Sequence, residues 1–371
     1  MDAPSGWADA SSLQRNNFDF LRFALASLVI FSHSFALLSG TDATEPLMRL
    51  TRGQVCSGEL AVDWFFVISG FLITHSWLRG RGTWDFFRKR ALRIYPAFVV
   101  AMIVCAAVVA PLALDDPADA FTRGQLVEFA RGAVTLSGYH HELTFPRNPL
   151  SAVNGSTWSI SFEAWCYVGL VLLGLTGLLR RRRFILAVFA VLILVSLVFL
   201  VFELHPGGKW FRVIFGSPRT WARLLPYYLA GVVFYLFNDR IPHSNRLAAI
   251  CAACLAAAPL IPYGVAVALP VAGTYVLFWF AFHPRVRLER WAARGDFSYG
   301  IYLYAFPIQQ LLIHWIPALR PLELFALAMP LSAACGMMSW HAVEKWFLYR
   351  KKTDAGRPPV VREAAAAAGA V

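Results

Sequence analysis

The feature that most constrains this chain is a series of long apolar runs, separated by short polar stretches that are rich in Lys and Arg. A helix needs roughly 20 apolar residues to cross the hydrocarbon core of a bilayer. Inside that core, each backbone N–H and C=O group must be hydrogen bonded within the segment, which a helix achieves and an open strand does not. The sequence therefore predicts an all-α polytopic membrane protein.

The composition agrees with this prediction. Hydrophobic residues make up 58% of the chain and charged residues 15%, whereas a soluble domain is about half apolar and a quarter charged. The net charge of +12 would suggest nucleic-acid binding in a soluble protein, but here the basic residues lie in short clusters between apolar runs. This distribution is typical of membrane topology, so we expect no nucleic-acid partner. The six cysteines lie mostly within apolar runs, and we interpret them as packing residues.

The apolar runs predict about ten membrane-spanning helices. Their expected bounds are residues 19–38, 58–78, 94–113, 157–179, 184–203, 222–238, 246–262, 264–282, 298–316 and 322–342. With both termini in the cytoplasm, the cytoplasmic connections and tail hold most of the 34 Lys and Arg residues, as the positive-inside rule requires.

This topology divides the chain into three parts. We expect a cytoplasmic segment at 1–17, a single membrane domain at 18–350, and a disordered cytoplasmic tail at 351–371. Two outer connections, 114–156 and 204–221, are long, and long connections in compact proteins are often functional or disordered.

The first apolar run contains two ionisable residues, Arg22 and His33. At about 100° per residue, their separation of eleven positions returns to nearly the same helix face, roughly 16 Å further along the axis. An ionisable group at membrane depth is costly, so each is a candidate for function. Arg22 also fits an anchor that extends to the interface, and His33 fits a hydrogen-bonded packing residue.

The second run carries Glu59 and Asp63 near its outer end and Ser69 with Gly70 in its middle. The two carboxylates lie one turn apart, and they either line an outer vestibule or sit hydrated among the headgroups. The small pair at 69–70 is typical of a site where two helices approach closely.

Two further segments combine charge with apolar surroundings. Arg90 and Arg93 share one helix face at the start of the third run, which suits an anionic ligand but is also explained in part by topology. The fourth run begins with Trp158 and Ser159, and it carries Glu163 inside an otherwise apolar helix. A buried carboxyl group needs a partner, for which His33 or an arginine is the natural candidate.

Together these segments, with a fifth near the C-terminus, resemble the acyltransferase-3 family of bacterial membrane enzymes that O-acylate surface carbohydrates. The five matching segments are Arg-x10-His (Arg22 and His33), the run from Phe65 to Phe71, Arg-x-x-Arg with Tyr95-Pro96 (Arg90 and Arg93), Trp-Ser-x-x-x-Glu (Trp158, Ser159 and Glu163), and Ser-Tyr-x-x-Tyr-Leu (Ser298 to Leu303). The resemblance extends over about residues 15–350. Ala305 stands where many relatives carry a second intramembrane His, and Ala164 stands where relatives often have a second acidic residue.

The resemblance implies transfer of an acyl group, most often acetyl, from cytoplasmic acyl-CoA to a hydroxyl of an exported or lipid-linked glycan. Acetyl-CoA would be the co-substrate, no metal is expected, and the enzyme would lie in the bacterial inner membrane. Its other partners would be membrane lipid and the polysaccharide-biosynthesis machinery.

The resemblance also implies roles for individual residues. His33 would act either as a general base or as a transient acyl carrier, with Glu163 orienting it or stabilising its imidazolium form. Arg22, Arg90 and Arg93 would bind the phosphates of the donor. Trp158, Ser159 and Tyr304 are the candidates for acceptor binding.

Two other classes of function remain open from the sequence. A transporter or flippase for a lipid-linked sugar also fits ten spans with buried His, Arg and Glu, although no inverted repeat is evident. A structural subunit of an export machine fits less well, because it gives the buried charges no purpose.

Overall fold

The computed structural model describes residues 16–348, apart from 142, 209–210, 212–213, 287, 289–290 and 292–294, and the side chains of 118 and 121. Within these residues every regular element is helical and there is no strand, which confirms the predicted all-α class. The predicted terminal segments, 1–17 and 351–371, lie almost wholly outside the described residues.

The helices of the first half are α1 (Phe18–Ser39), η1 (Asp42–Thr44), α2 (Pro46–Leu50), α3 (Ser57–Leu78), α4 (Thr83–Val104), η2 (Cys105–Val109), α5 (Ala110–Ala113), η3 (Pro117–Phe121), α6 (Arg123–Thr135), η4 (Gly155–Thr157), α7 (Trp158–Leu175) and η5 (Leu178–Arg180). Those of the second half are α8 (Arg182–Val201), α10 (Pro218–Leu236), α11 (Asn245–Ala257), η6 (Ala258–Leu260), α12 (Gly264–Ala268), η7 (Leu269–Gly273), α13 (Thr274–Ala281), α14 (Ser298–Trp315), α15 (Pro321–Ser339) and η8 (Trp340–Glu344).

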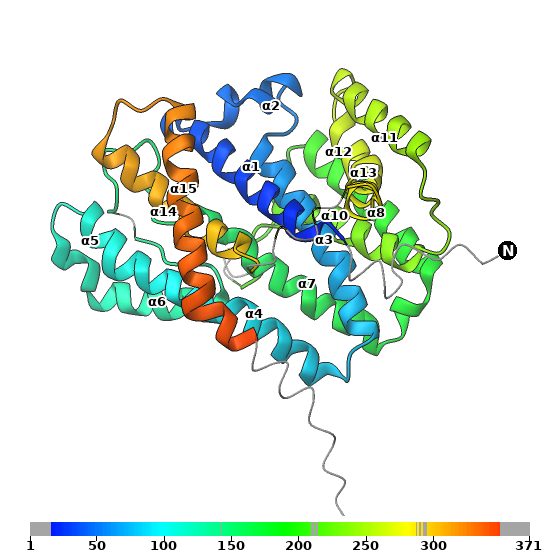
Figure 1. The fold of residues 1–371 in the computed structure, drawn as a ribbon, viewed down its shortest axis with the longest axis horizontal. Helices are drawn as coiled ribbons and strands as arrows, with labels where there is room; N and C mark the ends of the chain where they lie inside the picture. The colour runs from blue at the N-terminus through cyan, green and yellow to red at the C-terminus, as the bar shows by residue number, and fades with distance from the viewer. Residues whose placement is uncertain are drawn as a thin grey trace, which may run out of the picture.

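Helices α1 and α3 lie in the middle of the molecule, with α5 and α6 on one side and α11, α12 and α13 on the other (Figure 1). Helix α1 packs against α3, α14 and α15, and α3 packs against α10 as well. Segments that are far apart in the sequence therefore meet around these two helices.

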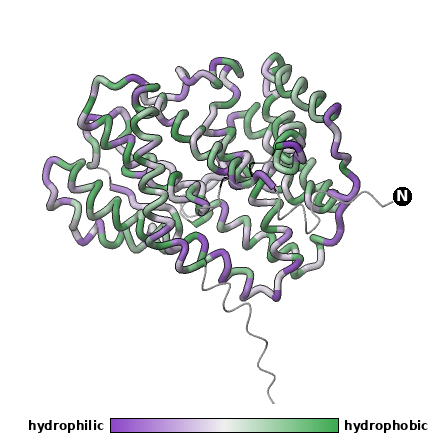
Figure 2. The backbone as a smooth tube through the Cα atoms, in the orientation of Figure 1, coloured by the Kyte–Doolittle hydropathy of each residue, from purple (hydrophilic) through white to green (hydrophobic). Residues whose placement is uncertain are grey.

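Among the residues that the structure describes, seven helical segments are long and apolar enough to cross a membrane, which supports a multi-pass membrane protein. They are Phe18–Ser39, Ser57–Leu78, Thr83–Ala113, Gly155–Leu175, Arg182–Val201, Gly264–Ala281 and Pro321–Leu348. Hydrophobic backbone positions run along the helices, whereas hydrophilic ones gather at their ends and in the connections (Figure 2). Ten spans remain a prediction.

The other three predicted spans are also helical, but they are shorter or more polar. The segment Asn245–Leu260 is apolar but short. Some polar groups of α10 and α14 are paired inside the protein: Arg223 binds Asp63, and the Gln309 side chain donates to the backbone O of Ile30 and to Ser34. Inward pairing of this kind is how membrane helices accommodate polar residues.

The third predicted span begins earlier than expected. Helix α4 starts at Thr83 and not at residue 94, so Arg90 and Arg93 lie within its first half. Its continuation through η2 and α5 extends the helical segment to Ala113.

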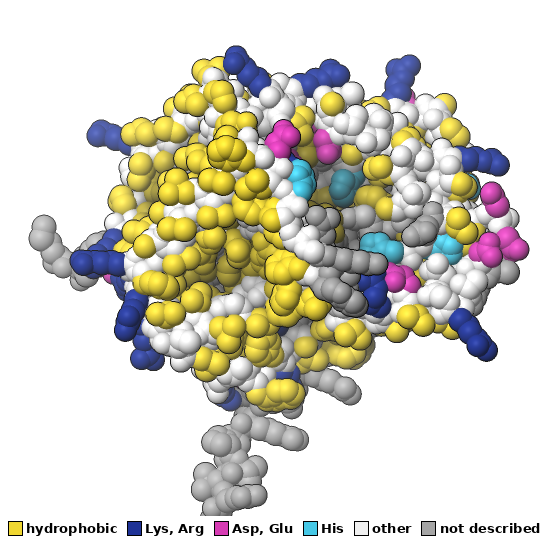
Figure 3. Space-filling model, turned by 180° about the vertical axis from the view of Figure 1, so that it is seen from behind, with side chains coloured by type: hydrophobic (Ala, Val, Ile, Leu, Met, Phe, Trp, Pro, Cys, Tyr) yellow, Lys and Arg dark blue, Asp and Glu magenta, His cyan; other side chains and the backbone are white. Residues whose placement is uncertain are grey.

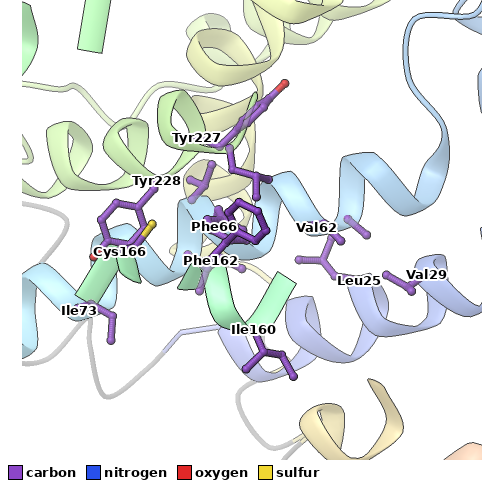
Figure 4. Packing of buried hydrophobic residues seen from close by; sticks show 14 of the residues in the cluster. Leu25, Val29, Val62, Phe66, Ile73, Ile160, Phe162, Cys166, Tyr227 and Tyr228 are labelled. Carbon is purple, nitrogen blue, oxygen red and sulfur yellow. The ribbon is translucent and has the colours of Figure 1, made fainter. Parts of the chain in front are cut away.

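The core lies between α1, α3, α7 and α10. Leu25 and Val29 of α1 face the α3 side chains Val62 and Phe66, and Ile160 of α7 lies nearby (Figure 4). By contrast, α8 turns most of its apolar residues outward, and only 17% of the residues in its most apolar 18-residue stretch are buried. The face seen in Figure 3 is largely covered by hydrophobic side chains, with Lys and Arg at its edges, as expected of a surface that meets lipid.

Candidate functional site

A cavity of about 350 Å³ lies where α1, α3, α4, α7 and the start of α14 meet. Five of the residues selected from the sequence line it, namely Arg22, Arg90, Arg93, Ser159 and Glu163. They come from α1, α4 and α7, so the cavity is assembled by tertiary packing. Its remaining lining includes apolar residues of α3 and the tyrosines Tyr167, Tyr299 and Tyr302.

One carboxylate, Asp296, joins two of these arginines. Its Oδ2 lies 2.5 Å from Nη2 of Arg93 and 3.6 Å from Nη1 of Arg22. Its Oδ1 accepts hydrogen bonds from the backbone N–H of Ser298 (3.3 Å) and from the Ser298 hydroxyl. Burial alone would raise the pKa of Asp296, but Arg93, Arg22 and the Ser298 hydrogen bonds hold it below its ordinary value.

A second carboxylate, Glu344, completes the surroundings of Arg93. Its Oε2 lies 3.4 Å from Arg93 Nη1, and its side chain is only 2% exposed. The Ser339 hydroxyl donates to the other oxygen at 3.3 Å. The Arg93 guanidinium also lies over the ring of Tyr299, 5.9 Å from its centroid. Arg93 is thus held by Asp296, which lies just before α14, by Tyr299 of α14 and by Glu344 of η8.

The sequence analysis missed Asp296 and Glu344. A signal for Glu344 was present, because it is a carboxylate close to the end of the last apolar run, where an ionisable group needs a partner. Asp296 stands two residues before the Ser-Tyr-x-x-Tyr-Leu segment, in a connection that gave no periodic signal.

Arg90 has different surroundings. Among the residues that the structure describes, no carboxylate forms an ion pair with it, and its buried Nε has no hydrogen-bond partner. It lines the cavity together with Glu163 and Tyr167 of α7. A buried N–H donor without a partner is costly, and an anionic ligand in the cavity would satisfy it.

Glu163 is oriented by two hydroxyl groups. Ser69 donates to its Oε1 at 2.8 Å, and Tyr167 donates to the same oxygen at 2.6 Å. Ser69, from the middle of α3, is therefore a ligand of the carboxylate, whereas its neighbour Gly70 has the packing role predicted for the pair. A Cβ at Gly70 would lie 2.0 Å from the backbone O of Tyr228 in α10.

His33 lies beyond the cavity and does not pair with Glu163. Its ring meets Phe306 edge to face at 5.2 Å between centroids, and its Nδ1 is buried without a partner among the described residues. Phe306 stands one helical turn after Tyr302, which lines the cavity. The expected contact between His33 and Glu163 is absent because His33 lies near the end of α1, eleven residues after the cavity residue Arg22.

The three residues selected for acceptor binding are not gathered in one place. The Ser159 hydroxyl shares a 2.8 Å hydrogen bond with Tyr302, which in turn donates to the backbone O of Ser156. Trp158 lines a separate cavity of about 600 Å³, together with Arg131 and His140. Tyr304 faces Ser339 of α15 and is not among the residues lining either cavity.

Helix α7 separates these two cavities. Ser159, Ile160, Glu163 and Tyr167 face the first cavity, whereas Trp158, Ser161 and Phe162 face the second. Within the described part of the chain, no group of three or more His, Cys, Asp or Glu side chains forms an arrangement that would hold a metal ion. The first cavity offers three arginines and an oriented carboxylate in its wall, and the His33 imidazole lies outside it, against Phe306.

Comparison with known proteins gives consistent results. The model of a family described as an acyltransferase domain matches residues 15–341. An O-acetyl transferase of Shigella phage Sf6 is 28% identical over 351 residues, which cover 90% of this chain and 96% of that protein. Nodulation protein 10 of Rhizobium leguminosarum bv. viciae is 30% identical over 377 residues, covering 90% of this chain and 94% of that protein.

A third relative is longer. The putative peptidoglycan O-acetyltransferase YrhL of Bacillus subtilis (strain 168) is 26% identical over 288 residues, which cover 68% of this chain and 44% of that protein. No solved structure matches the chain significantly. The family match extends across all five sequence segments and every residue that lines the first cavity. The chain therefore belongs to the acyltransferase-3 family.

Proposed function

We propose that this protein transfers an acyl group, in the first instance acetyl, from acyl-CoA to a hydroxyl of a surface or exported polysaccharide or of its lipid-linked precursor. The observation that carries the proposal is the first cavity, which brings Arg22, Arg90 and Arg93 to one mouth and places Glu163 in its wall. The relatives named for O-acetyl transfer support acetyl as the group and a carbohydrate as the acceptor.

The position of the cavity fits a cytoplasmic donor. Its arginines come from the start of α1 and the first half of α4, and its lining continues along α3 to the beginning of α7. In a ten-span topology with the N-terminus inside, α1, α4 and α14 begin at the cytoplasmic face, where positive residues gather, and α7 begins on the outer side. The arginine-lined part of the cavity would then receive the phosphates of acyl-CoA, and the thioester would point along α1 towards His33.

In the reaction, the carbonyl carbon of the acyl thioester forms a bond to the sugar oxygen while its bond to sulfur breaks. The hydroxyl proton leaves through a base, and the CoA thiol departs with a proton. The His33 Nδ1, buried without a partner among the described residues, is available as this base. It can alternatively take the acyl group first and pass it to the sugar in a second displacement.

The experiment is mass spectrometry of surface polysaccharide and lipid-linked glycan from cells with wild-type protein, with His33→Ala, and without the gene. We expect an acyl-ester mass on the glycan that wild type restores and His33→Ala does not, at equal protein levels in the membrane. Acylation that persists in His33→Ala would contradict the role of His33. Unchanged acylation without the gene, with lipid-linked glycan accumulating on the cytoplasmic side, would indicate a carrier.

A further inference from the structure

The three arginines at the cavity mouth differ in how far their charge is already compensated. Arg93 binds Asp296 and Glu344, and Arg22 binds Asp19 at 3.1 Å and lies 3.6 Å from Asp296. Arg90 has no carboxylate partner among the described residues, although it lines the same cavity. The Arg-x-x-Arg segment therefore presents one compensated and one uncompensated guanidinium group.

Recruiting Arg93 to an anionic ligand would be costly. The ligand would have to displace Asp296 from a 2.5 Å contact, or leave Glu344, only 2% exposed, without its cation. A carboxylate left unpaired in a buried position is strongly destabilising. Arg90 carries no such cost, because a phosphate oxygen would give its buried Nε the partner that it lacks.

The partners of Arg93 also hold the cavity wall in place. Through Oδ1, Asp296 holds the first turn of α14, from which Ser298, Tyr299 and Tyr302 face the cavity. Through Glu344, Arg93 connects α4 to η8, and these two elements pack together. Arg93 is thus the point at which α4, α14 and the end of the α15 segment are joined.

We propose that the two arginines have different tasks: Arg93 is a positioning residue fixed by Asp296 and Glu344, and Arg90 is the group that binds the phosphates of the acyl-CoA donor. This inference rests on the proposed function and deepens it. It assigns Asp296 and Glu344 to the donor side of the reaction, as positioning residues that act through Arg93 and the start of α14.

The test compares two donors in the full-length protein reconstituted in lipid nanodiscs. Acetyl-CoA carries phosphates, whereas acetyl-pantetheine has the same thioester arm without them. We expect Arg90→Ala to raise the KM for acetyl-CoA at least tenfold, to leave the KM for acetyl-pantetheine unchanged and to keep the melting temperature of wild type. Arg90→Lys should give an intermediate KM. Arg88→Ala, which removes the same charge outside the cavity wall, is the matched control and should behave as wild type.

Positioning variants should give a different pattern. Asp296→Asn should lower kcat several-fold with both donors, at a temperature where the protein remains folded, and Asp296→Glu should restore most of it. Arg93→Ala should lower the melting temperature and affect both donors alike. Two results would overturn the inference. One is an Arg93→Ala protein of wild-type stability that loses activity with acetyl-CoA and keeps it with acetyl-pantetheine. The other is an Arg90→Ala protein whose KM values for the two donors have the same ratio as in wild type.

Binding of CoA, measured by titration calorimetry, separates the inference from the proposed function. Weaker CoA binding in Arg90→Ala without acetyl transfer by wild type would retain the inference and contradict the function. Acetyl transfer by wild type together with equal CoA affinity in Arg90→Ala would retain the function and contradict the inference.

Discussion

At the residue scale, Glu163 is the side chain with the most defined local chemistry. Both of its hydroxyl donors, Ser69 and Tyr167, bind Oε1, so its other oxygen carries no hydrogen bond from the described residues. We expect Glu163→Gln, which keeps the shape and removes the charge, to lower kcat by about 10²-fold or more. Ser69→Ala removes one orienting hydrogen bond, worth about 0.5–1.5 kcal/mol, and should lower kcat only several-fold. Initial rates at saturating donor distinguish the two, and equal rates in Glu163→Gln and wild type would remove Glu163 from the site.

Asp296 predicts a pH dependence of stability. Its pKa lies below the ordinary value in the folded protein, so its pairing with Arg93 stabilises the fold above about pH 4 and is lost as the pH falls further. The difference in melting temperature between wild type and Asp296→Asn should therefore stay constant from pH 8 to pH 6 and shrink in strong acid. Thermal unfolding of both proteins in one detergent checks this. A difference that already shrinks between pH 8 and pH 6 would show that Asp296 is not held charged.

At the element scale, α3 and α10 approach each other through two glycines. A Cβ at Gly231 of α10 would lie 2.0 Å from the backbone O of Val67 in α3. In the same way, a Cβ at Gly70 of α3 would lie 2.0 Å from the backbone O of Tyr228 in α10. The obstructing atoms belong to backbone and cannot rotate away. We expect Gly70→Ala and Gly231→Ala each to lower the free energy of unfolding by about 1–3 kcal/mol. Gly169→Ala, where a Cβ meets nothing within 4 Å, is the control in thermal unfolding. Unchanged stability in both interface variants would mean that the helices are less closely packed.

The same two helices share an ion pair that should behave cooperatively. Arg223 of α10 lies 2.9 Å from Asp63, which is 2% exposed, and 3.1 Å from Glu59. Removing only the cation leaves a buried carboxylate unpaired, which costs about 3–5 kcal/mol. Arg223→Met should therefore destabilise the protein more than the double variant Arg223→Met with Asp63→Asn. A double-mutant cycle measured by thermal unfolding tests this, and additive effects would contradict direct pairing.

The sequence predicted elements better than contacts. Each of the ten apolar runs corresponds to helix, because hydrophobic length is a local property. The role of Gly70 was also predicted correctly. The partners of Asp63 and Glu163 were not predicted. Asp63 pairs with Arg223 and Glu163 accepts from Ser69, and each partner lies on another helix, so that only packing brings the two groups together. Asp296 was missed for the same reason.

At the scale of the whole molecule, the sequence selected five of the residues that line the first cavity without predicting the cavity itself. Arg22, Arg90, Arg93, Ser159 and Glu163 were chosen because charge or polarity is costly at membrane depth. His33 was expected beside Glu163 and instead lies outside the cavity, against Phe306. Periodicity places a residue on one helix face, but it does not determine which helix that face meets.

The last prediction concerns which side of the membrane the cavity mouth faces. If the chain has ten spans with both ends inside, four connections lie in the cytoplasm, namely those that follow α3, α7, α10 and α13. The cavity lined by Arg90 and Arg93 then opens towards cytoplasmic acyl-CoA. Reporter fusions at 79–82, 176–181 and 237–244 should then report the cytoplasm, and fusions at 40–56 and 114–154 the opposite side. The informative fusion is at 237–244, because α10 is too polar to be recognised by hydropathy alone. An external location there would mean that α10 does not span, and an external location at 79–82 would place the arginines away from the donor and contradict the proposed direction of transfer.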